Sequence, residues 1–307
     1  MKGKTMQQDA IIIGGGFAGL SAAYILGRAR RHVTIIDSGT PRNRFAAHSH
    51  GVLALDGKSG LEILADARRQ LAAYPTVTFI EGEADSAEGV IDDFHVRIAG
   101  QDAIVARRLL LASGMEDRLP DIPGVKERWG KTVLHCPYCH GYEIGGGPLG
   151  VLATHPMSAH QAAVVADWGD VTLFTNAMPE PDEAALSLLE RRNVSLQAGA
   201  VSAIESGADD MLSVHLATGR FFEVKALFVG PDLHIRGSIA KSLGCQLEET
   251  PAGKIIATDA VKATSVAGVY AAGDIARAFG NITLSSADGV LAGLGVHQSL
   301  MFAGAHP

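Results

Sequence analysis

The sequence predicts an α/β protein with two Rossmann-like, three-layer domains, each built on a parallel sheet. Three observations predict it. The chain has 307 residues, a length that suits two domains. A glycine-rich loop joins a strand to a helix near the start of the chain, and a second strand–loop–helix–strand unit begins near residue 149. Strands that alternate with helices in this order pair in parallel, because each helix returns the chain across the sheet.

The first glycine-rich loop is typical of a Rossmann-like nucleotide-binding unit. A predicted strand at 11–13 leads into Gly14-Gly15-Gly16-Phe17-Ala18-Gly19, and a predicted helix follows at 20–26. This is G-x-G-x-x-G between a strand and a helix, the setting that makes the motif credible. The first glycine allows a tight turn, the second lets the backbone approach a pyrophosphate, and the third lets helix and strand pack closely. The helix N-terminus then faces the phosphates.

A carboxylate follows at the spacing expected for a bound nucleotide. The second predicted strand, 32–36, ends at Asp37, which lies 18 residues after Gly19. An acidic residue at about this spacing binds an adenosine ribose hydroxyl. We therefore expect a dinucleotide here, and the motif by itself fits both FAD and NAD.

The polar loop at 42–51 carries His48 and His50. It fits a loop that wraps the far end of the nucleotide and, equally well, a plain solvated loop. The rest of this region is predicted to contain a helix at 60–74 and strands at 77–80, 94–98 and 105–111. The last strand runs into the small residues Ala112-Ser113-Gly114, which indicates that something packs on the backbone there.

A C-x-x-C pair lies in the middle of the chain, at Cys136 and Cys139, and His140 follows it directly. This is the spacing of a redox dithiol. If Cys136 opens a helix, the helix dipole stabilises its thiolate, which is the form that attacks a disulfide. A histidine here can exchange the proton near neutral pH. Half of a zinc site is the alternative, but zinc usually needs a second pair and the only other cysteine is the isolated Cys245.

The second strand–loop–helix–strand unit lacks the features of a nucleotide site. Its strands are predicted at 149–153 and 171–174, and its helix at 158–166. The loop at 154–159 contains no glycine, so its side chains occupy the space that a pyrophosphate needs. No Lys or Arg occurs from residue 132 to residue 190. Strong NADPH binding is therefore not expected, unless cations from elsewhere in the fold serve the site.

The last third of the chain completes both domains. Gly230-Pro231 marks a boundary after a helix and strands predicted at 182–192, around 194, at 212–216 and at 222–229. A strand from Val269 ends in Gly273-Asp274, where a carboxylate can bind a polyol. A helix of small residues is predicted at 284–300, and its N-terminus can stabilise negative charge on a ring system. Trp168 is predicted to lie in the core, with no assigned role.

Composition excludes several classes of partner. The formal net charge is −7 and no basic run occurs, which argues against nucleic acid and anionic membranes as partners. Three cysteines do not make a disulfide framework, so we expect a reducing, cytoplasmic setting. The uncharged stretch at 10–27 resembles a signal peptide or membrane span. Its four glycines and short apolar run favour a strand, a turn and a helix instead.

Four blocks in this order resemble the low-molecular-weight thioredoxin reductase family of flavoproteins: the first glycine loop, the Ala112-Ser113-Gly114 turn, the C-x-x-C helix and the strand that ends in Gly273-Asp274. The resemblance implies FAD in a domain built from 1–116 and 232–307. It also implies an inserted pyridine-nucleotide-type domain at 117–231 that carries the C-x-x-C pair. Members of the family are usually homodimers through the FAD domains.

The resemblance also implies roles for single residues. Cys139 would be the sulfur nearest the flavin, and Cys136 would exchange disulfides with the substrate. Asp274 would bind the ribitol. No metal is expected. The residues expected to contact FAD are Gly14, Gly16, Phe17, Ala18, Gly19, Asp37, Ser38, Arg44, His50, Ala84, Ala112, Ser113, Gly114, Gly273, Asp274, Asn281 and Ile282.

Two departures from the family's reductases shape the functional hypothesis. His140 stands where they carry an aspartate, and the second glycine loop and its basic residues are missing. The stretch Cys-Pro-Tyr-Cys-His-Gly-Tyr-Glu is more similar to dithiol oxidases of the same fold, which close disulfides in gliotoxin-type and holomycin-type metabolites. The leading hypothesis is an FAD-dependent oxidase of a small-molecule dithiol or a thioredoxin-like protein, in which His140 relays the proton.

Three alternatives stay open. The chain could be an NADPH-dependent thioredoxin reductase with a divergent loop. It could be a reductase that takes electrons from ferredoxin or a second flavin, although an acidic chain gives little electrostatic steering toward an acidic ferredoxin. The third is a flavin-bound redox sensor without turnover.

Overall fold

The computed structural model describes residues 7–302, and within them the chain forms two compact units. The first unit comprises residues 7–44, 61–116 and 233–302, and the second comprises 45–60 and 117–232. The chain passes between them four times: at residues 44–45 and 60–61, and within two strands, β7 (Met115–Arg118) and β16 (Asp232–Ile235). The segment at 45–60 therefore belongs with the second unit, although it lies between two stretches of the first in sequence.

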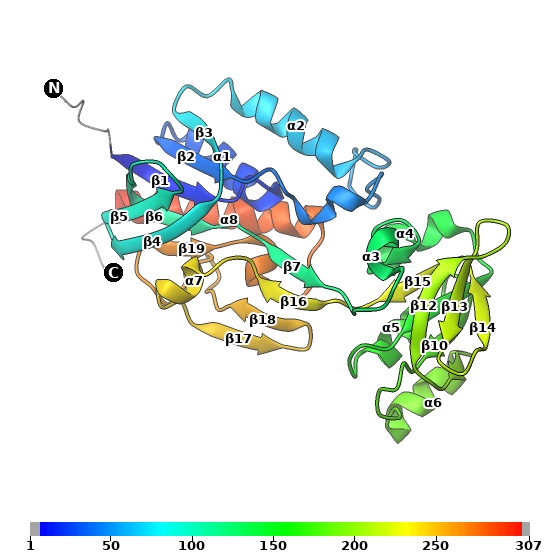
Figure 1. Cartoon of the computed structure of the whole chain (residues 1–307). Helices are drawn as coiled ribbons and strands as arrows, with labels where there is room; N and C mark the ends of the chain where they lie inside the picture. Colours follow the sequence, from blue (N-terminus) through cyan, green and yellow to red (C-terminus); the bar gives the residue numbers. More distant parts are fainter. Residues whose placement is uncertain (1–6, 303–307) are drawn as a thin grey trace. The chain divides into compact units, whose positions relative to one another are not determined.

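The first unit is a seven-stranded sheet with a helical face (Figure 1). Besides β7 and β16, its elements are β1 (Gln8–Ile13), α1 (Phe17–Arg28), β2 (Val33–Asp37), η1 (Arg42–Phe45), α2 (Gly60–Leu71), β3 (Val77–Glu81), β4 (Ala84–Val90), β5 (Asp93–Ile98), β6 (Ile104–Leu111), α7 (Ile239–Ser242), β17 (Leu247–Thr250), β18 (Gly253–Ile256), β19 (Val269–Ala271), η2 (Gly273–Ala276) and α8 (Ile282–Met301). The expected α/β fold class is confirmed.

The order of the strands in this sheet brings both ends of the chain to its centre. Strands β3, β2, β1 and β6 are parallel, with Ile12 of β1 opposite Ile35 on one side and Leu110 on the other. The N-terminal half of β6 pairs with β5, and its C-terminal half pairs in parallel with β19. Alternate side chains of β1 enter two separate cores, which is why its apolar run is continuous.

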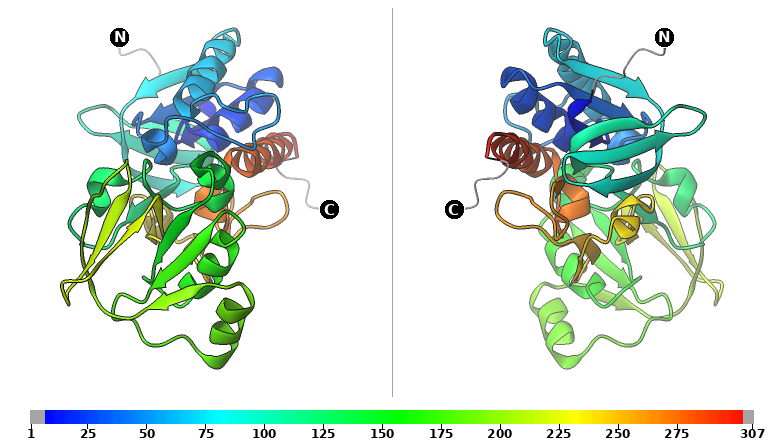
Figure 2. Two further views of the ribbon diagram at one scale, coloured as in Figure 1. Left: turned by 90° about the vertical axis from the view of Figure 1, so that its right-hand side faces the viewer. Right: turned by 90° about the vertical axis from the view of Figure 1, so that its left-hand side faces the viewer.

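The two cores of the first unit lie on opposite faces of the sheet and are covered by different elements (Figure 2). Helices α1, α2 and α8 pack on one face, and the β4–β5 hairpin with α7 covers the other. Helices α1 and α8 approach closely because α8 carries glycines at the contact. A Cβ at Gly289 would overlap the carbonyl group of Ala18, and one at Gly293 would lie 2.9 Å from the Cβ of Ile25. The small residues of α8 are therefore required by packing.

The second unit has three layers. Its elements are α3 (Val125–Arg128), β8 (Val133–Leu134), α4 (Pro137–Ile144), β9 (Pro148–Leu152), α5 (Ser158–Val165), β10 (Asp170–Phe174), α6 (Glu183–Arg191), β11 (Ser195–Gln197), β12 (Val201–Ser206), β13 (Leu212–Leu216), β14 (Phe221–Val224) and β15 (Ala226–Val229). A five-stranded sheet of order β11-β10-β9-β15-β8 packs between the helices and the three-stranded sheet β12-β13-β14.

One expected strand of this unit is wrong. The apolar run at 222–229 is two strands, β14 and β15, which belong to different sheets. They separate at Lys225, whose N–H donates to the carbonyl of Pro148 at 2.8 Å. Strand β14 pairs antiparallel with β13, whereas β15 pairs parallel with β9. The hydrophobic pattern is the same on both sides of the bend, so the sequence carries no signal for it.

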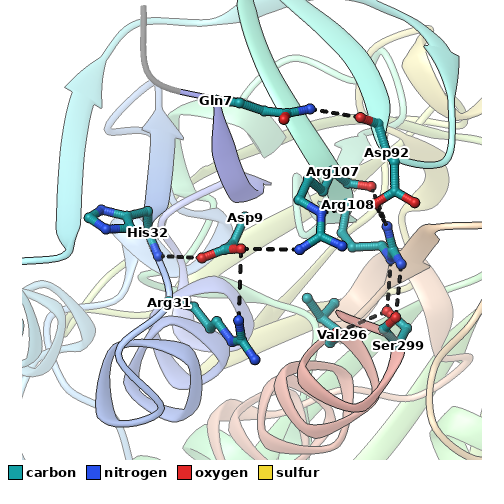
Figure 3. A network of polar contacts seen from close by, with 9 residues as sticks. All are labelled: Gln7, Asp9, Arg31, His32, Asp92, Arg107, Arg108, Val296 and Ser299. Carbon is teal, nitrogen blue, oxygen red and sulfur yellow. Dashed lines mark hydrogen bonds and ion pairs between the residues drawn. The ribbon is translucent and has the colours of Figure 1, made fainter. Parts of the chain in front are cut away.

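A buried arginine fixes the C-terminal end of α8 to the sheet of the first unit (Figure 3). The guanidinium of Arg108 is fully buried. It donates to the Ser299 hydroxyl and carbonyl, each at 2.8 Å, and to the carboxylate of Asp92 at 2.8 Å. Burial acts to raise the pKa of Asp92, but hydrogen bonds from Arg108 and Arg107 outweigh it and hold that pKa below its usual value.

No helix within residues 7–302 is both long enough and apolar enough to cross a membrane.

Replacing Arg108 by methionine is expected to lower the free energy of unfolding by about 3 kcal/mol, because it removes the buried donor to Ser299 and one of the two arginine donors to Asp92. Arg107→Met is the matched control, since Arg107 also pairs with Asp92 but lies 31% exposed, and its loss should cost about 1 kcal/mol or less. Urea denaturation of both variants measures the difference. The part of the Arg108 contribution that comes from Asp92 should be complete above about pH 4 and lost as the pH falls through the lowered pKa of Asp92, whereas the bonds to Ser299 should persist. Equal losses for the two variants would contradict this account.

Candidate active site

The C-x-x-C pair forms a disulfide at the start of α4. Cys136 is the N-cap residue, with an extended backbone (φ −104°, ψ 112°), and Pro137 opens the helix. Cys136 and Cys139 are joined as a disulfide, with their Cα atoms 5.3 Å apart. Both sulfurs therefore lie in the first turn, where the helix dipole favours a thiolate once the bond is reduced. In the disulfide form neither sulfur can bind zinc.

Trp168 holds α4 in place, a role that the sequence did not indicate. Its ring covers Gly141, so closely that a Cβ there would lie 2.6 Å from the indole. The edge of the Tyr138 ring also meets it, with centroids 5.3 Å apart and planes at 89°. Gly141 is required by this packing, because any larger residue would lift the helix from the indole. No spacing rule connects a tryptophan in the α5–β10 turn to a helix 27 residues earlier.

Charged groups flank His140 on α4. Burial lowers the pKa of His140, the negative charge of Glu143 opposes this, and the positive charge of His50 adds to it. Glu143 lies 3.4 Å from Nδ1 of His50, and the same nitrogen lies 3.4 Å from Asp56. A lowered pKa keeps His140 neutral at physiological pH, as a base that accepts a thiol proton must be.

Packing requires a glycine at two positions of the first loop, Gly14 and Gly19, as the motif predicts. Gly14 has φ +110°, and a Cβ there would overlap the carbonyl of Ala112. A Cβ at Gly19 would overlap the carbonyl of Gly14. A Cβ at Gly16 would meet no atom within 4 Å, so packing does not explain this glycine. Gly16 is also the N-cap of α1 and offers no side chain to the first-turn N–H groups. The loop therefore encloses an open cradle lined by backbone.

Asp37 is held at the end of β2. Its carboxylate accepts the N–H of Gly15 at 3.0 Å and pairs with Arg68 of α2. It therefore stands directly behind the glycine loop, on the carboxyl edge of the sheet. The structure brings the loop and this carboxylate together as the spacing predicts.

Asp274 and the N-terminus of α8 meet near the same edge. The Asp274 carboxylate pairs with Arg42 at 2.9 Å and accepts the hydroxyl of Ser285 at 3.2 Å. Asn281 caps α8 by accepting the N–H of Leu284 at 2.8 Å. Arg42 was not among the expected site residues, although it lies in the polar loop.

The other expected FAD contacts lie in the same unit, with one exception. Strands β6 and β19 end side by side, where Gly114 has φ +73° and the Ser113 hydroxyl donates to the carbonyl of Arg236. Ala84 opens β4 after a turn at Gly82, whose N–H donates to the carbonyl of Asp37. All the expected contacts except His50 belong to the first unit. His50 belongs to the second and lies against Glu143.

The glycine-free loop of the second unit is closed by its own side chains. The Ser158 hydroxyl accepts the N–H groups of Thr154 and His155 at 3.1 and 3.4 Å. The Thr154 hydroxyl donates to the carbonyl of Gly230 at 2.7 Å, and the His155 ring packs on Gly230. Burial lowers the pKa of His155, against the opposing charge of Asp232. Side chains thus use donors and space that a pyrophosphate would need at this loop.

Comparison with known proteins decides the family. Residues 8–289 match the family model described as pyridine nucleotide-disulphide oxidoreductase. The chain belongs to the pyridine nucleotide-disulphide oxidoreductase family. Within this family it is 32% identical over 298 residues to thioredoxin reductase tcpT of Claviceps purpurea, which covers 93% of this chain and 92% of that one.

Solved structures of the family support the same placement. An oxidoreductase from Agrobacterium tumefaciens superposes with a TM-score of 0.92 at 46% identity, covering 97% of this chain and 99% of that one. HlmI superposes with a TM-score of 0.90 at 39% identity, covering 98% and 95%. The chain is a thiol–disulfide oxidoreductase of the thioredoxin reductase type, whose members bind FAD. Within residues 7–302 no cluster of three His, Cys, Asp or Glu side chains is arranged to hold a metal ion.

Proposed function

We propose that this protein oxidises a dithiol to its disulfide and passes the electrons through FAD to oxygen or another acceptor, without efficient use of NADPH. The observation that carries the proposal is the loop at 154–158, which is filled by its own side chains beside an intact redox disulfide. An enzyme that takes no hydride from NADPH needs another source of electrons, and we propose that the thiol substrate is that source. The second candidate is an NADPH-dependent thioredoxin reductase, favoured by the similarity to thioredoxin reductase tcpT of Claviceps purpurea.

The residues of the first unit fit FAD. The cradle at Gly16 gives the pyrophosphate room and leaves the first-turn N–H groups of α1 to bind it. Asp37 supports the loop and offers its carboxylate to the ribose. Asp274 would bind the ribitol, held in position by Arg42 and Ser285. When bound, FAD accepts the electron pair from the enzyme dithiol and hands it on to the acceptor.

The disulfide and His140 account for the first half-reaction. A substrate thiolate attacks Cys136, which breaks the bond to Cys139 and forms a mixed disulfide. The second substrate thiol loses its proton to His140 and displaces Cys136, which closes the substrate disulfide. The substrate loses two electrons and two protons. Its first thiol releases one proton to solvent on ionising, its second thiol gives the other to His140, and Cys136 and Cys139 take up the two electrons as thiolates. The expected roles stand as proposals, with Cys136 facing the substrate and Cys139 the flavin.

Charge in the second unit also disfavours NADPH. Sixteen Asp and Glu face nine Lys and Arg in its segments, which gives the unit the whole formal charge of −7. A 2′-phosphate usually needs an arginine just after the second strand of the nucleotide unit. Here β10 is followed by Thr175 and Asn176, and the Asn176 side chain is used to accept the N–H of Val201 at 3.0 Å.

The deciding experiment is anaerobic mixing of the purified flavoprotein with either dithiothreitol or NADPH, while flavin absorbance is followed. Dithiothreitol should bleach the flavin, and NADPH at micromolar levels should leave it oxidised over the same time. Cys139→Ser and His140→Gln should each slow bleaching by dithiol by about a hundredfold or more, because they remove the attacked disulfide or the base. Rapid bleaching by NADPH would reject the proposal in favour of the reductase.

Paired glycine variants test the FAD site. Gly16→Val should give folded protein with the melting temperature of the wild-type apoprotein but little bound flavin, because the new side chain fills only the cradle. Gly19→Val should instead unfold the first unit, since it collides with the Gly14 carbonyl. Flavin absorbance relative to protein, together with thermal melting of apoprotein, separates the two effects. Full flavin binding in folded Gly16→Val would show that the cradle holds something else.

We also propose a homodimer through the first unit. Leu284, Leu291, Leu294 and Met301 are all 38–47% exposed and recur along one side of α8, whose other side packs on α1. A second copy of the same stripe is the proposed occupant. Light scattering should report a dimer for the wild type and a monomer for Leu291→Glu/Leu294→Glu. The control Leu61→Glu/Val90→Glu adds the same charges to exposed apolar positions elsewhere in the unit and should stay dimeric.

A further inference from the structure

The segment at 45–60 makes two contacts within the second unit, one of them with the dithiol helix. Phe45 lies on Gly130, where a Cβ would come within 2.5 Å of the Phe45 Cβ. Five residues later, His50 lies with Nδ1 at 3.4 Å from Glu143 and 3.4 Å from Asp56. The imidazole of His50 thus lies between the carboxylate of Asp56 in the same segment and that of Glu143 on α4.

Glu143 is well placed to act on His140. The two residues are three apart on α4, and side chains with this spacing share one side of a helix. Glu143 is 41% exposed and His50 is 22% exposed, so their charges are only partly screened by solvent. The loop that follows α4 and the α5–β10 region carry no cation of their own, because no Lys or Arg occurs from residue 132 to residue 190. The side chain of Lys225 packs on Gly147 in that loop.

We propose that Glu143 and His50 are a pair of positioning residues that set the proton affinity of His140 in opposite directions. This inference rests on the proposed function in one respect, that His140 is the base that accepts the proton of the dithiol. The carboxylate of Glu143 stabilises the imidazolium that forms when His140 accepts that proton. The imidazole of His50, when protonated, cancels part of this effect and disfavours a second positive charge nearby.

The charged groups around the pair are few. Glu143 and His50 are the charges that act on His140, in agreement with the directions in which they move its pKa. Asp56 acts on His50 and is itself held by the N–H of Gly51 at 2.8 Å, which with the His50 contact lowers the pKa of Asp56. The segment also carries His48, whose ring lies 6.4 Å from that of His50, and Lys58, whose carbonyl accepts the N–H of Ser49 at 2.8 Å.

The two members of the pair can be removed separately with opposite expected signs. Glu143→Gln takes away the stabilising carboxylate, so His140 should titrate at lower pH than in the wild type. His50→Asn takes away the opposing positive charge, so His140 should titrate at higher pH. A purely structural contact would give no such opposition, because loosening the segment would have the same effect from either side.

The experiment is an NMR titration of the imidazole Cε1–H signals in the oxidised, flavin-loaded protein, with His140 assigned by its loss in His140→Gln. Glu205→Gln is the matched control, because Glu205 forms a pair of the same length, 3.4 Å, with His215 on β12 and β13. This control should leave the His140 titration unchanged. Shifts of the same sign in Glu143→Gln and His50→Asn, no shift in either, or an equal shift in the control would overturn the inference.

The titration needs no turnover, so it stands even if dithiol oxidation fails. Where turnover is present, the acidic limb of the pH–rate profile should move in the same two directions, with a fall of about threefold to tenfold at the optimum in Glu143→Gln. Flavin content gives a further readout. The His50→Asn variant should bind a full complement of flavin. A loss of flavin would instead indicate that His50 contacts the cofactor, and would overturn its assignment as a partner of Glu143.

Discussion

The chemistry depends on the attachment of one short helix. Two sulfurs in the first turn of α4 are useful only if that turn keeps its place while the bond between them opens and closes. The indole of Trp168 packs against Gly141 and supplies this support. The αL residue Gly145 ends the helix after two turns. The helix is too short to be stable by itself, so tertiary packing must provide its stability. The position of the dithiol is therefore a property of the second unit as a whole.

Both units contain a strand–loop–helix motif, but only the loop of the first unit leaves space beside its backbone. In the first, three glycines remove side chains from the loop, and one of them leaves room that packing does not need. In the second, Ser158 satisfies the loop N–H groups, and Thr154 and His155 fill the space against Gly230. Under the proposed function, a fold with two places for nucleotides retains one. The change needs only a few side chains at the loop, and the underlying sheet is unaffected.

Local patterns made much of this structure predictable. The glycine loop, the carboxylate at Asp37 and the helix that Cys136 opens all follow from neighbours close in sequence, so periodicity and spacing were sufficient. The placement of Trp168 and Arg108 depends on contacts between distant segments, for which a single sequence has no signal. His50 shows the limit most clearly. It lies in a polar loop suited to either unit, and only the packing of Phe45 on Gly130 assigns that loop to the second.

The uneven distribution of charge has a kinetic consequence. A unit that carries the whole formal charge of −7 repels anions over roughly one Debye length, about 8 Å at physiological ionic strength. The rate at which a thiol compound encounters this unit will therefore depend on the charge of that compound. Carboxylated thiols will arrive more slowly than neutral ones. High salt will erase this difference and leave only the selectivity that direct contact provides.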